Sequence, residues 1–325
     1  MQILTPSRQR AWRKCARFER IRYQDGYVQV ALSEPMHFGT LFHDMVANFW
    51  RGLIAPAATG DPYLDARLDL AFTAYRDGWA DAHEYAVLAI EAPYEAPMVN
   101  PDTFAHSRTF RLAGVIDLLL KDASGAVILV EHKTTSEDIS DDGAPYWRRL
   151  AMDSQLSHYV AGALVLGHEV TKIIYDVTAR PGLKPLLATP SEARKFTKDG
   201  RLYANQRDTD ETSDDYRARL FADLAERPAR YFRRRETARL ESEVRDGLLD
   251  TWADGRMLRE SQLAGRAPRN PDACHAMGTC EYWEHCALGV ALAESDRWKR
   301  VTGAGIFPEL PAALVVGATE MREEG

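Results

Sequence analysis

The sequence lacks two features that would have assigned it to a broad class at once. Positive charge is not in excess, because 41 Lys and Arg stand against 48 Asp and Glu in 325 residues, which gives a net charge of −7. Proteins that coat nucleic acid through bulk charge normally carry an excess of Lys and Arg, so that class is excluded, although a local basic groove is not. No apolar run approaches the ~18–20 residues that span a bilayer, and the N-terminus has no apolar stretch typical of a secretory signal. The sequence therefore predicts a cytoplasmic protein without a membrane partner.

Cysteine is also scarce, and its count and spacing are informative. The chain has four cysteines, Cys15, Cys274, Cys280 and Cys286. In a cytoplasmic protein, cysteines bind metals or act in catalysis more often than they form disulfides, and four thiolates complete one tetrahedral ligand set. The paired C-x2-C knuckles of a zinc ribbon are absent. Because thiolates bind both zinc and iron–sulfur clusters, the residues leave zinc, a cluster or free structural cysteines open, with His275 and His285 as alternative ligands.

The sequence does contain enough apolar residues for a large core. Hydrophobic residues make up 45% of the chain, and its length allows one elaborated domain or two small ones. Hydrophobic spacing and turn residues predict helices at 38–51, 65–80 and 153–166, strands at 86–92 and 171–177, and a β-hairpin at 110–133. This order predicts an α/β core in which a helix crosses over between strands. The following residues, 181–262, are polar and helix-prone, which predicts a helical insertion.

The predicted hairpin carries three charged residues among apolar ones. Asp117 lies in the first strand, and Glu131 and Lys133 lie in the second, on either side of a turn at 122–125. Side chains alternate along a strand, so Glu131 and Lys133 share a face while His132 points to the other. Pairing around the turn places Asp117 opposite residue 131 or 132. A divalent cation with a lysine beside it would satisfy these carboxylates, and an ion pair on an exposed face is the alternative.

Three further residues extend this candidate site. His43 lies beside the main apolar stripe of the helix at 38–51, where it is either a residue flanking a site or a partly buried histidine. Gln155 and Tyr159 are four residues apart on the helix at 153–166 and therefore share one face. Taken alone, Tyr159 could equally be a core residue and Gln155 a solvated neighbour.

Taken in order, four short motifs resemble those of a known family. The motifs are Gly39-x-x-x-His43, Gly114-Val115-Ile116-Asp117, Glu131-His132-Lys133 and Gln155-x-x-x-Tyr159. Their combination resembles the PD-(D/E)xK nuclease superfamily, in particular the RecB-like branch that includes CRISPR-associated and AddB-type iron–sulfur nucleases. The resemblance covers roughly residues 7–180 and the C-terminal cysteines. Residues 194–220 also look like stand-alone members encoded by phages and prophages, and Ile116 stands where the superfamily name has Pro.

This resemblance implies a restriction-endonuclease-like core, a central mixed sheet flanked by helices, that hydrolyses phosphodiester bonds with Mg²⁺ or Mn²⁺. The implied metal ligands are His43, Asp117, Glu131 and the backbone carbonyl of His132. Lys133 would orient or help to deprotonate the attacking water and offset charge on the phosphate. Gln155 and Tyr159 would position the DNA strand near the scissile bond.

The resemblance also implies a [4Fe–4S] cluster on the four cysteines, with Zn²⁺ as the alternative. In the family, the cluster joins the N-terminal segment to the C-terminal one around the nuclease core. The first gap between the late cysteines is commonly two residues in the family and is five here. The expected organisation is a nuclease core at 1–180 that includes Cys15, a helical, polar insertion at 181–265, a cysteine segment that completes the core at 266–290, and a tail at 291–325.

Positive charge gathers in two segments. Residues 227–239 hold six Arg and one Glu, and residues 8–22 hold seven Lys and Arg and one Glu. Basic residues interleaved with aromatic ones can follow phosphates and stack on unpaired bases, and a solvated helix face is the alternative. The predicted DNA contacts are Arg230, Tyr231, Arg233, Arg234 and Arg235.

The sequence thus favours an exonuclease acting on single-stranded DNA or linear duplex ends in recombination, repair or phage DNA processing. No G-x-x-x-x-G-K-[ST] loop occurs, so the chain is not its own helicase motor. It would act alone, as a homo-oligomer, or with a recombinase, a single-strand-binding protein or a helicase. The alternatives are a structure-specific endonuclease and a non-catalytic DNA-binding module that keeps the fold.

Overall fold

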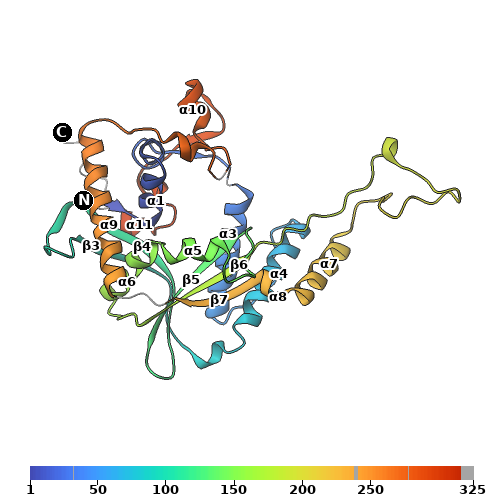
Figure 1. Ribbon diagram of the computed structural model, residues 1–325, viewed down its shortest axis with the longest axis horizontal. Helices are drawn as coiled ribbons and strands as arrows, with labels where there is room; N and C mark the ends of the chain where they lie inside the picture. The colour runs from blue at the N-terminus through green and yellow to red at the C-terminus, as the bar shows by residue number, and fades with distance from the viewer. Residues whose placement is uncertain (32, 238–240, 277, 316–325) are drawn as a thin grey trace.

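The computed structural model describes residues 1–31, 33–237, 241–276 and 278–315 (Figure 1). The strands of its central sheet are β1 (Gln2–Leu4), β3 (Ala86–Val99), β4 (His106–Lys121), β5 (Val127–Thr135), β6 (Lys172–Ala179) and β7 (Phe232–Thr237). A second, two-stranded sheet pairs β2 (Tyr27–Gln29) with β8 (Trp298–Arg300). The α-helices are α1 (Pro6–Lys14), α2 (Ala16–Glu19), α3 (Glu34–Trp50), α4 (Pro62–Gly78), α5 (Pro145–Ala151), α6 (Gln155–Val165), α7 (Ser213–Glu226), α8 (Pro228–Tyr231), α9 (Glu241–Leu263), α10 (Trp283–Leu288) and α11 (Ala312–Val315).

Strand β4 connects the two halves of the central sheet. Along one edge it pairs antiparallel with β3. Along its other edge, residues 110–112 of β4 pair parallel with β1, and residues 118–121 pair antiparallel with β5. Beyond β5 the sheet continues with β6 in parallel and β7 in antiparallel. Parallel pairing of β5 with β6 requires a crossover, which α5 and α6 supply, so the predicted α/β core with a crossover helix is confirmed.

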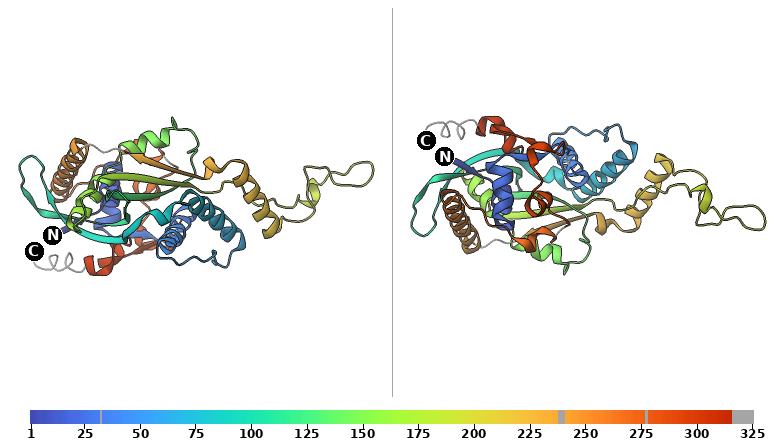
Figure 2. Two further views of the ribbon diagram at one scale, coloured as in Figure 1. Left: turned by 90° about the horizontal axis from the view of Figure 1, so that it is seen from below. Right: turned by 90° about the horizontal axis from the view of Figure 1, so that it is seen from above.

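Alternation along the strands gives the sheet two apolar faces. On one face, Leu119, Leu129 and Tyr175 belong to a core that includes residues of α5, α6 and α9. On the other face, Leu118 and Val130 pack with residues of α3 and α4. Helices therefore cover both sides of the sheet, as Figure 2 shows.

The elements predicted between residues 38 and 177 are confirmed, with different ends. The largest difference is β3, which continues to Val99, beyond the predicted 86–92. Its later part contains Pro93, Glu95 and Pro97, which weaken the strand pattern. Proline is tolerated on edge strands, and β3 pairs with β4 alone among the described strands.

Residues 181–265 differ from the predicted helical insertion. They include α7 and α8, but also β7, which is a strand of the central sheet, and α9, which packs with α6 in the main core. Strand β7 carries the run Arg233-Arg234-Arg235, which has none of the apolar alternation that predicts a strand. It forms because the edge of β6 is open to it and because these arginines find partners on neighbouring loops.

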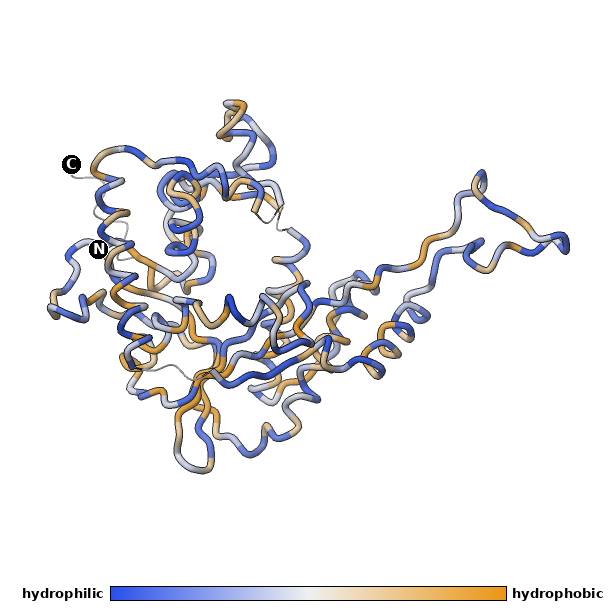
Figure 3. Tube along the Cα trace, in the orientation of Figure 1, coloured by the Kyte–Doolittle hydropathy of each residue, from blue (hydrophilic) through white to orange (hydrophobic). Residues whose placement is uncertain are grey.

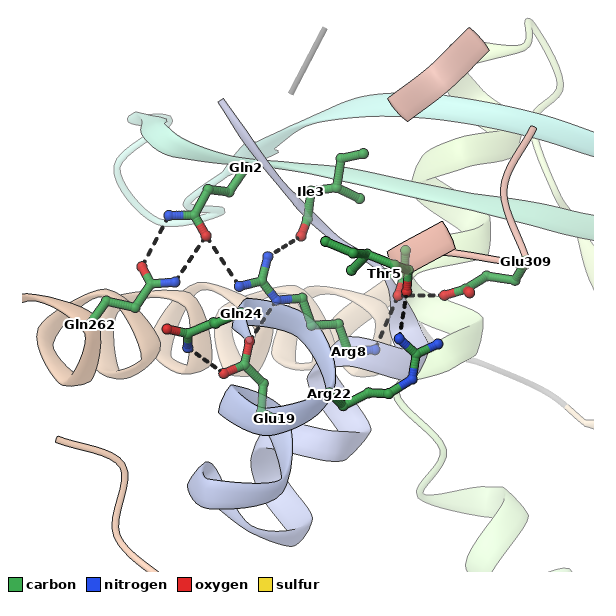
Figure 4. Close-up of polar contacts among 10 residues, drawn as sticks. Gln2, Ile3, Thr5, Arg8, Glu19, Arg22, Gln24, Gln262 and Glu309 are labelled. Atoms are coloured by element: carbon green, nitrogen blue, oxygen red, sulfur yellow. Dashed lines mark hydrogen bonds and ion pairs between the residues drawn. The ribbon is translucent and has the colours of Figure 1, made fainter. Parts of the chain in front are cut away.

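The two ends of the described chain are packed together, so residues 291–315, the described part of the predicted tail, lie against the N-terminal segment. Phe307 and Leu310 are buried against residues of β1 and the N-terminal helices. In Figure 4, buried Arg8 donates to Glu19 at 2.8 Å, and Thr5 donates to Glu309 at 3.1 Å. The rest of the predicted tail, 316–325, lies outside the described residues.

No helix in the described part of the chain is long and apolar enough to cross a membrane.

Candidate functional site

The candidate site forms where β4 and β5 separate. Their paired residues run from Lys121 and Val127 to Leu118 and Val130, and the ladder ends there. At the next position, the carboxylate of Asp117 accepts a hydrogen bond from the backbone N–H of residue 132 at 2.8 Å. A side chain thus satisfies a backbone donor that the ladder leaves unpaired. The predicted placement of Asp117 opposite residue 131 or 132 is consistent with this contact.

Glu131 and Lys133 point to the side of the sheet covered by α6, where they meet the predicted helix residues. Lys133 Nζ lies 2.6 Å from Glu131 Oε1 and donates to Gln155 Oε1 at 2.6 Å. Gln155 Nε2 in turn donates to the Tyr159 hydroxyl at 2.7 Å. Asp153, just before α6, lies 3.6 Å from Lys133 Nζ. A continuous polar chain therefore joins the strand residues to the helix residues.

Glu91 was not predicted as a site residue, yet it lies with two residues that were. One ligand atom from each of His43, Glu91 and Asp117 lies within 4.8 Å of the other two. The neighbours of Glu91 in β3 pair with residues 116 and 118, so it stands opposite Asp117. Its φ is +47°, a region that residues other than glycine seldom adopt. The sequence held one signal for it, an acid within an apolar strand, the same signal that marked Asp117.

Glu131 lies outside this group of three ligand atoms, although it was a predicted metal ligand. One of its oxygens is ion-paired with Lys133, and the other is buried without a hydrogen-bond partner among the described residues. The role of the backbone carbonyl of His132 as a ligand stays a prediction. The three-residue group therefore shares His43 and Asp117 with the predicted set and adds Glu91.

Burial disfavours the charged form of the three carboxyl groups at this site. It raises the pKa of Asp117 to about 7, with Glu91 adding to the effect. It likewise raises the pKa of Glu131 to about 7, with Asp117 adding to the effect, and the pKa of Glu91 to about 7. A divalent cation would relieve this repulsion and supply a partner for the unpaired oxygen of Glu131. The donor set of carboxylates and one imidazole fits Mg²⁺ or Mn²⁺.

His43 is held neutral, whereas Lys133 is held positively charged. Burial lowers the pKa of His43 despite the nearby carboxylate of Glu131, which favours the neutral imidazole that binds metals. Burial also opposes the charge on Lys133, but Glu131 and Asp153 outweigh it and raise the pKa of Lys133. The site therefore holds a fixed cation beside a group of potential metal ligands.

Two glycines set the distance between α6 and the sheet. A Cβ at Gly114, in the G-V-I-D motif, would lie 2.7 Å from the hydroxyl of Tyr94, and one at Gly162 would lie 2.5 Å from its ring. The ring of Tyr94 in turn packs edge-on against Tyr159 at 6.1 Å. Only glycine allows this approach, so both positions help to fix the helix that presents Gln155 and Tyr159.

The side chain of His132 points to the other face of the sheet, as alternation predicts. Its Nε2 lies 3.0 Å from the hydroxyl of Tyr75 and 3.6 Å from Asp176. Asp176 accepts a 2.6 Å hydrogen bond from Trp79 Nε1, and burial raises its pKa to about 7. Burial lowers the pKa of His132 well below its usual range. This buried network therefore stabilises β5 on the face opposite to Glu131 and Lys133.

The four cysteines come together although Cys15 is more than 250 residues from the others. All four line one small pocket, of about 30 Å³, between the junction of α1 and α2 and the segment 269–286. Hydrogen bonds join the two segments, since the Asn270 side-chain amide Nδ2 donates to Lys14 O at 2.9 Å and the Arg17 N–H donates to Pro268 O at 3.1 Å. The predicted juxtaposition of the N-terminal and C-terminal segments is therefore present in the structure.

The predicted DNA contacts on 230–235 are arranged differently from expectation. Tyr231 is buried, and its hydroxyl bonds to Asp223, so its ring is not free to stack on a base. Arg234 lies over the ring of Trp79 at 3.5 Å and pairs with Asp81, which makes it a support for the buried network. Strand pairing explains the position of Arg234, because β7 turns its side chain toward the protein, whereas Tyr231 ends α8 and packs with Tyr216 and Leu220 of α7.

The remaining arginines of this segment are less enclosed. Arg233 pairs with Asp142, and Arg235 donates to the Asp142 carbonyl and lies 5.1 Å from the ring of Trp147. Arg230 is exposed. DNA contact by these three residues stays a prediction.

One residue of the basic segment at 8–22 reaches the site directly. Arg10 Nη2 donates to Gln155 Oε1 at 2.9 Å and lies 4.0 Å from Asp153. Its side chain is 61% exposed, so it contacts both solvent and the polar chain that ends at Tyr159. The sequence marked this segment as a second candidate for DNA contact, but nothing in its local pattern indicates that α1 packs near the start of α6.

Comparison with known proteins agrees with this geometry. No protein of curated function matches the chain. Among solved structures, the one described as "Crystal structure of SSO0001" is similar over 69% of this chain and 75% of that chain, with 14% identity and a TM-score of 0.26, a likeness too low to carry an argument. The family model for the PD-(D/E)XK nuclease superfamily matches residues 3–287. This match spans most of the sequence and includes every residue of the site, and the chain therefore belongs to the PD-(D/E)XK nuclease superfamily.

Proposed function

We propose that this protein is a deoxyribonuclease that uses Mg²⁺ or Mn²⁺ to degrade linear DNA from its ends. The observation that carries the proposal is the meeting of His43, Glu91 and Asp117 within 4.8 Å, beside the Glu131–Lys133 ion pair. Members of this superfamily are metal-dependent nucleases, and an intact set of acids and lysine argues against a non-catalytic binding module. The preference for an exonuclease rests on the resemblance of the motifs to the RecB-like branch.

The site residues would have different roles in the reaction. His43, Glu91 and Asp117, with Glu131 next to them, would hold the metal. When bound, the metal supplies charge neutralisation on the phosphate and a more acidic water. Lys133 is placed to orient that water and to offset charge that develops on the phosphate.

Gln155 serves as the link between catalysis and substrate position. It accepts from Lys133 and Arg10 and donates to Tyr159, so it fixes the ammonium group in relation to the helix. Exposed Arg10 would contact the DNA backbone next to the scissile bond, whereas Tyr159 is buried in the main core and holds Gln155 through its hydroxyl. The expected setting is recombination, repair or phage DNA processing, with a recombinase, a single-strand-binding protein or a helicase as partner.

Substrate topology provides the direct test of this proposal. With Mn²⁺, the protein should degrade linear DNA while leaving a covalently closed circle of the same sequence intact. Blocking both ends of the linear substrate should slow the reaction by at least about 10-fold, because an exonuclease needs a free end. Gel analysis of the three substrates checks this. Cutting of the circle at a comparable rate would instead assign an endonuclease.

We also propose that the four cysteines bind a [4Fe–4S] cluster that joins the ends of the nuclease core. All four line one pocket, and thiolate ligands fit such a cluster. The preference for a cluster over a single zinc ion rests on the resemblance of the cysteine arrangement, one early and three late, to that of the iron–sulfur nucleases.

Colour and metal content distinguish the two cofactors. Purified protein should be brown, with broad absorbance near ~400 nm and close to four irons per chain. Cys280→Ser should bleach this band and lower the melting temperature, because the cluster holds distant segments together. Ser295→Ala is the control, since the Ser295 hydroxyl accepts from Arg297 N–H at 3.4 Å and bonds to no thiol among the described residues, and it should leave the spectrum unchanged. A colourless protein with one zinc per chain would replace the cluster by zinc.

A further inference from the structure

A long arm projects from the protein and is not explained by the fold or by the catalytic site. It comprises residues 184–211, between β6 and α7, and all three views show it reaching away from the body (Figures 1 and 2). Its two legs are joined by hydrogen bonds. Thr189 N–H donates to Arg207 O at 2.9 Å, and Arg194 Nη2 donates to Asp208 O at 3.0 Å. The arm therefore has a defined hairpin-like shape that the core does not require.

The end of the arm is strongly basic. Residues 194–207 contain five Lys and Arg and one Asp, so 5 − 1 gives a local charge of +4 in a chain whose net charge is −7. The side chains of Lys195, Lys198 and Arg201 are exposed and form no hydrogen bond or ion pair with the described residues. Unpaired cations held at the end of a shaped arm are suited to an anionic partner.

Aromatic side chains alternate with these cations. Phe196 is 57% exposed and Tyr203 is 45% exposed, and neither belongs to a described core cluster. Figure 3 shows the arm as a mixture of hydrophilic and hydrophobic residues along its length. Exposed aromatic rings among unpaired cations are the combination that binds single-stranded nucleic acid, because bases stack on the rings while phosphates meet the cations.

The base of the arm lies near the catalytic edge of the sheet. A cavity of about 490 Å³ there is lined by residues 179–185, which lead from the end of β6 into the arm, and by residues 136–138, which follow β5. Ser136 is three residues beyond Lys133, a distance of about 10 Å along an extended chain. The cavity has a mixed lining of four cations and three acids, in which Glu34 pairs with Arg67 and Arg180. Lys184 and Arg230 are the cations of this lining without an ion pair among the described residues. A strand leaving the catalytic site could therefore pass this cavity and reach the arm.

We propose that the arm is a binding surface for single-stranded DNA, which holds the strand on one side of the cleavage site. This inference rests on the proposed nuclease function. Lys195, Lys198 and Arg201 contact backbone phosphates, and Phe196 and Tyr203 stack on bases. A protein partner would suit the exposed apolar leg at Leu186 and Leu187, but the unpaired charge favours DNA.

The test measures DNA binding without cleavage. A fluorescent single strand of about 40 nucleotides is titrated in EDTA, so that no metal supports hydrolysis. The triple variant Lys195→Ala, Lys198→Ala, Arg201→Ala should bind at least about 10-fold more weakly at moderate salt. Its plot of log K against log salt should be shallower by about 2, since each single-strand phosphate contact contributes ~0.7. The double variant Phe196→Ala, Tyr203→Ala should weaken binding while leaving this slope unchanged.

A matched control variant distinguishes the effect of contacts made by the arm from the effect of a lower net positive charge on DNA binding. Arg76→Ala, Lys121→Ala, Arg245→Ala removes the same charge from other parts of the surface and should leave both affinity and slope near those of the parent protein. Equal weakening by the two triple variants, or no weakening by the arm variant, would overturn the proposal, and the second result would leave a protein partner as the explanation of the arm. Tighter binding of a duplex by the arm would overturn the assignment to single strands. Cleavage of linear DNA by the parent with Mn²⁺ tests the nuclease function separately.

Discussion

Replacing Lys133 by Ala should lower Mn²⁺-dependent cleavage of linear DNA by about 10²–10³-fold, the usual effect of removing one preorganised group that stabilises transition-state charge. The ammonium group lies 2.6 Å from both Glu131 and Gln155. Its loss removes the fixed cation and releases Gln155 from its position. Single-turnover rates at saturating Mn²⁺ measure this loss apart from metal affinity.

A second readout distinguishes catalysis from a simple loss of structure. Without Lys133, Glu131 loses the cation that lowers its pKa, so its pKa should rise above the value of about 7. Residual activity should therefore shift to higher pH. The control is Lys172→Ala on the neighbouring strand, which breaks a 2.8 Å ion pair with Asp122 far along the ladder from the site. Its activity should stay within about twofold of the parent. Parent-like activity of Lys133→Ala would remove the lysine from the mechanism.

Those parts of the site that depend on local rules could be predicted from the sequence. The turn at 122–125 and the two-residue period of strands fix which residues of β4 and β5 meet, and these rules placed Asp117, Glu131 and Lys133 correctly relative to one another. The four-residue spacing of Gln155 and Tyr159 likewise placed them on one helix face. Bringing that helix face to the strands required only the crossover that parallel pairing demands.

Other parts depend on tertiary contacts that no local pattern encodes. Glu91 becomes a potential ligand because β3 pairs with β4 in one register, and a shift of one residue would turn its side chain to the other face. Strand β7 forms on the open edge of β6 although its sequence is a run of arginines. The contact between Arg10 and Gln155 depends on how α1 packs near α6. In each case the partner, rather than the residue itself, decides the structure.

Metal binding should stabilise this protein in a way that depends on pH. The pKa values of Glu91, Asp117 and Glu131 are raised to about 7 in the fold, above their ordinary values of 4.5, 3.8 and 4.5. The folded state thus holds more protons than the unfolded state between about pH 4 and 7, so metal-free stability should fall as pH rises through this range. Because a metal cation competes with these protons for the carboxylates, its affinity should increase as the pH rises through the same range. Saturating Mn²⁺ should therefore raise the melting temperature by about 5 °C at pH 8 and by little at pH 5.

Glu91 makes this prediction specific to a residue. Glu91→Gln keeps the size of the side chain and removes one anionic ligand, so the Mn²⁺-induced rise at pH 8 should shrink to about half or less, and the Mn²⁺ concentration needed for cleavage should increase by about 10–100-fold. Glu95→Gln is the matched control. It lies on the same strand, and its carboxylate pairs with Arg111 at 3.0 Å instead of facing the site. A normal Mn²⁺ response in Glu91→Gln would exclude Glu91 as a ligand, whereas a weakened response in both variants would point to the strand as a whole rather than to the metal group.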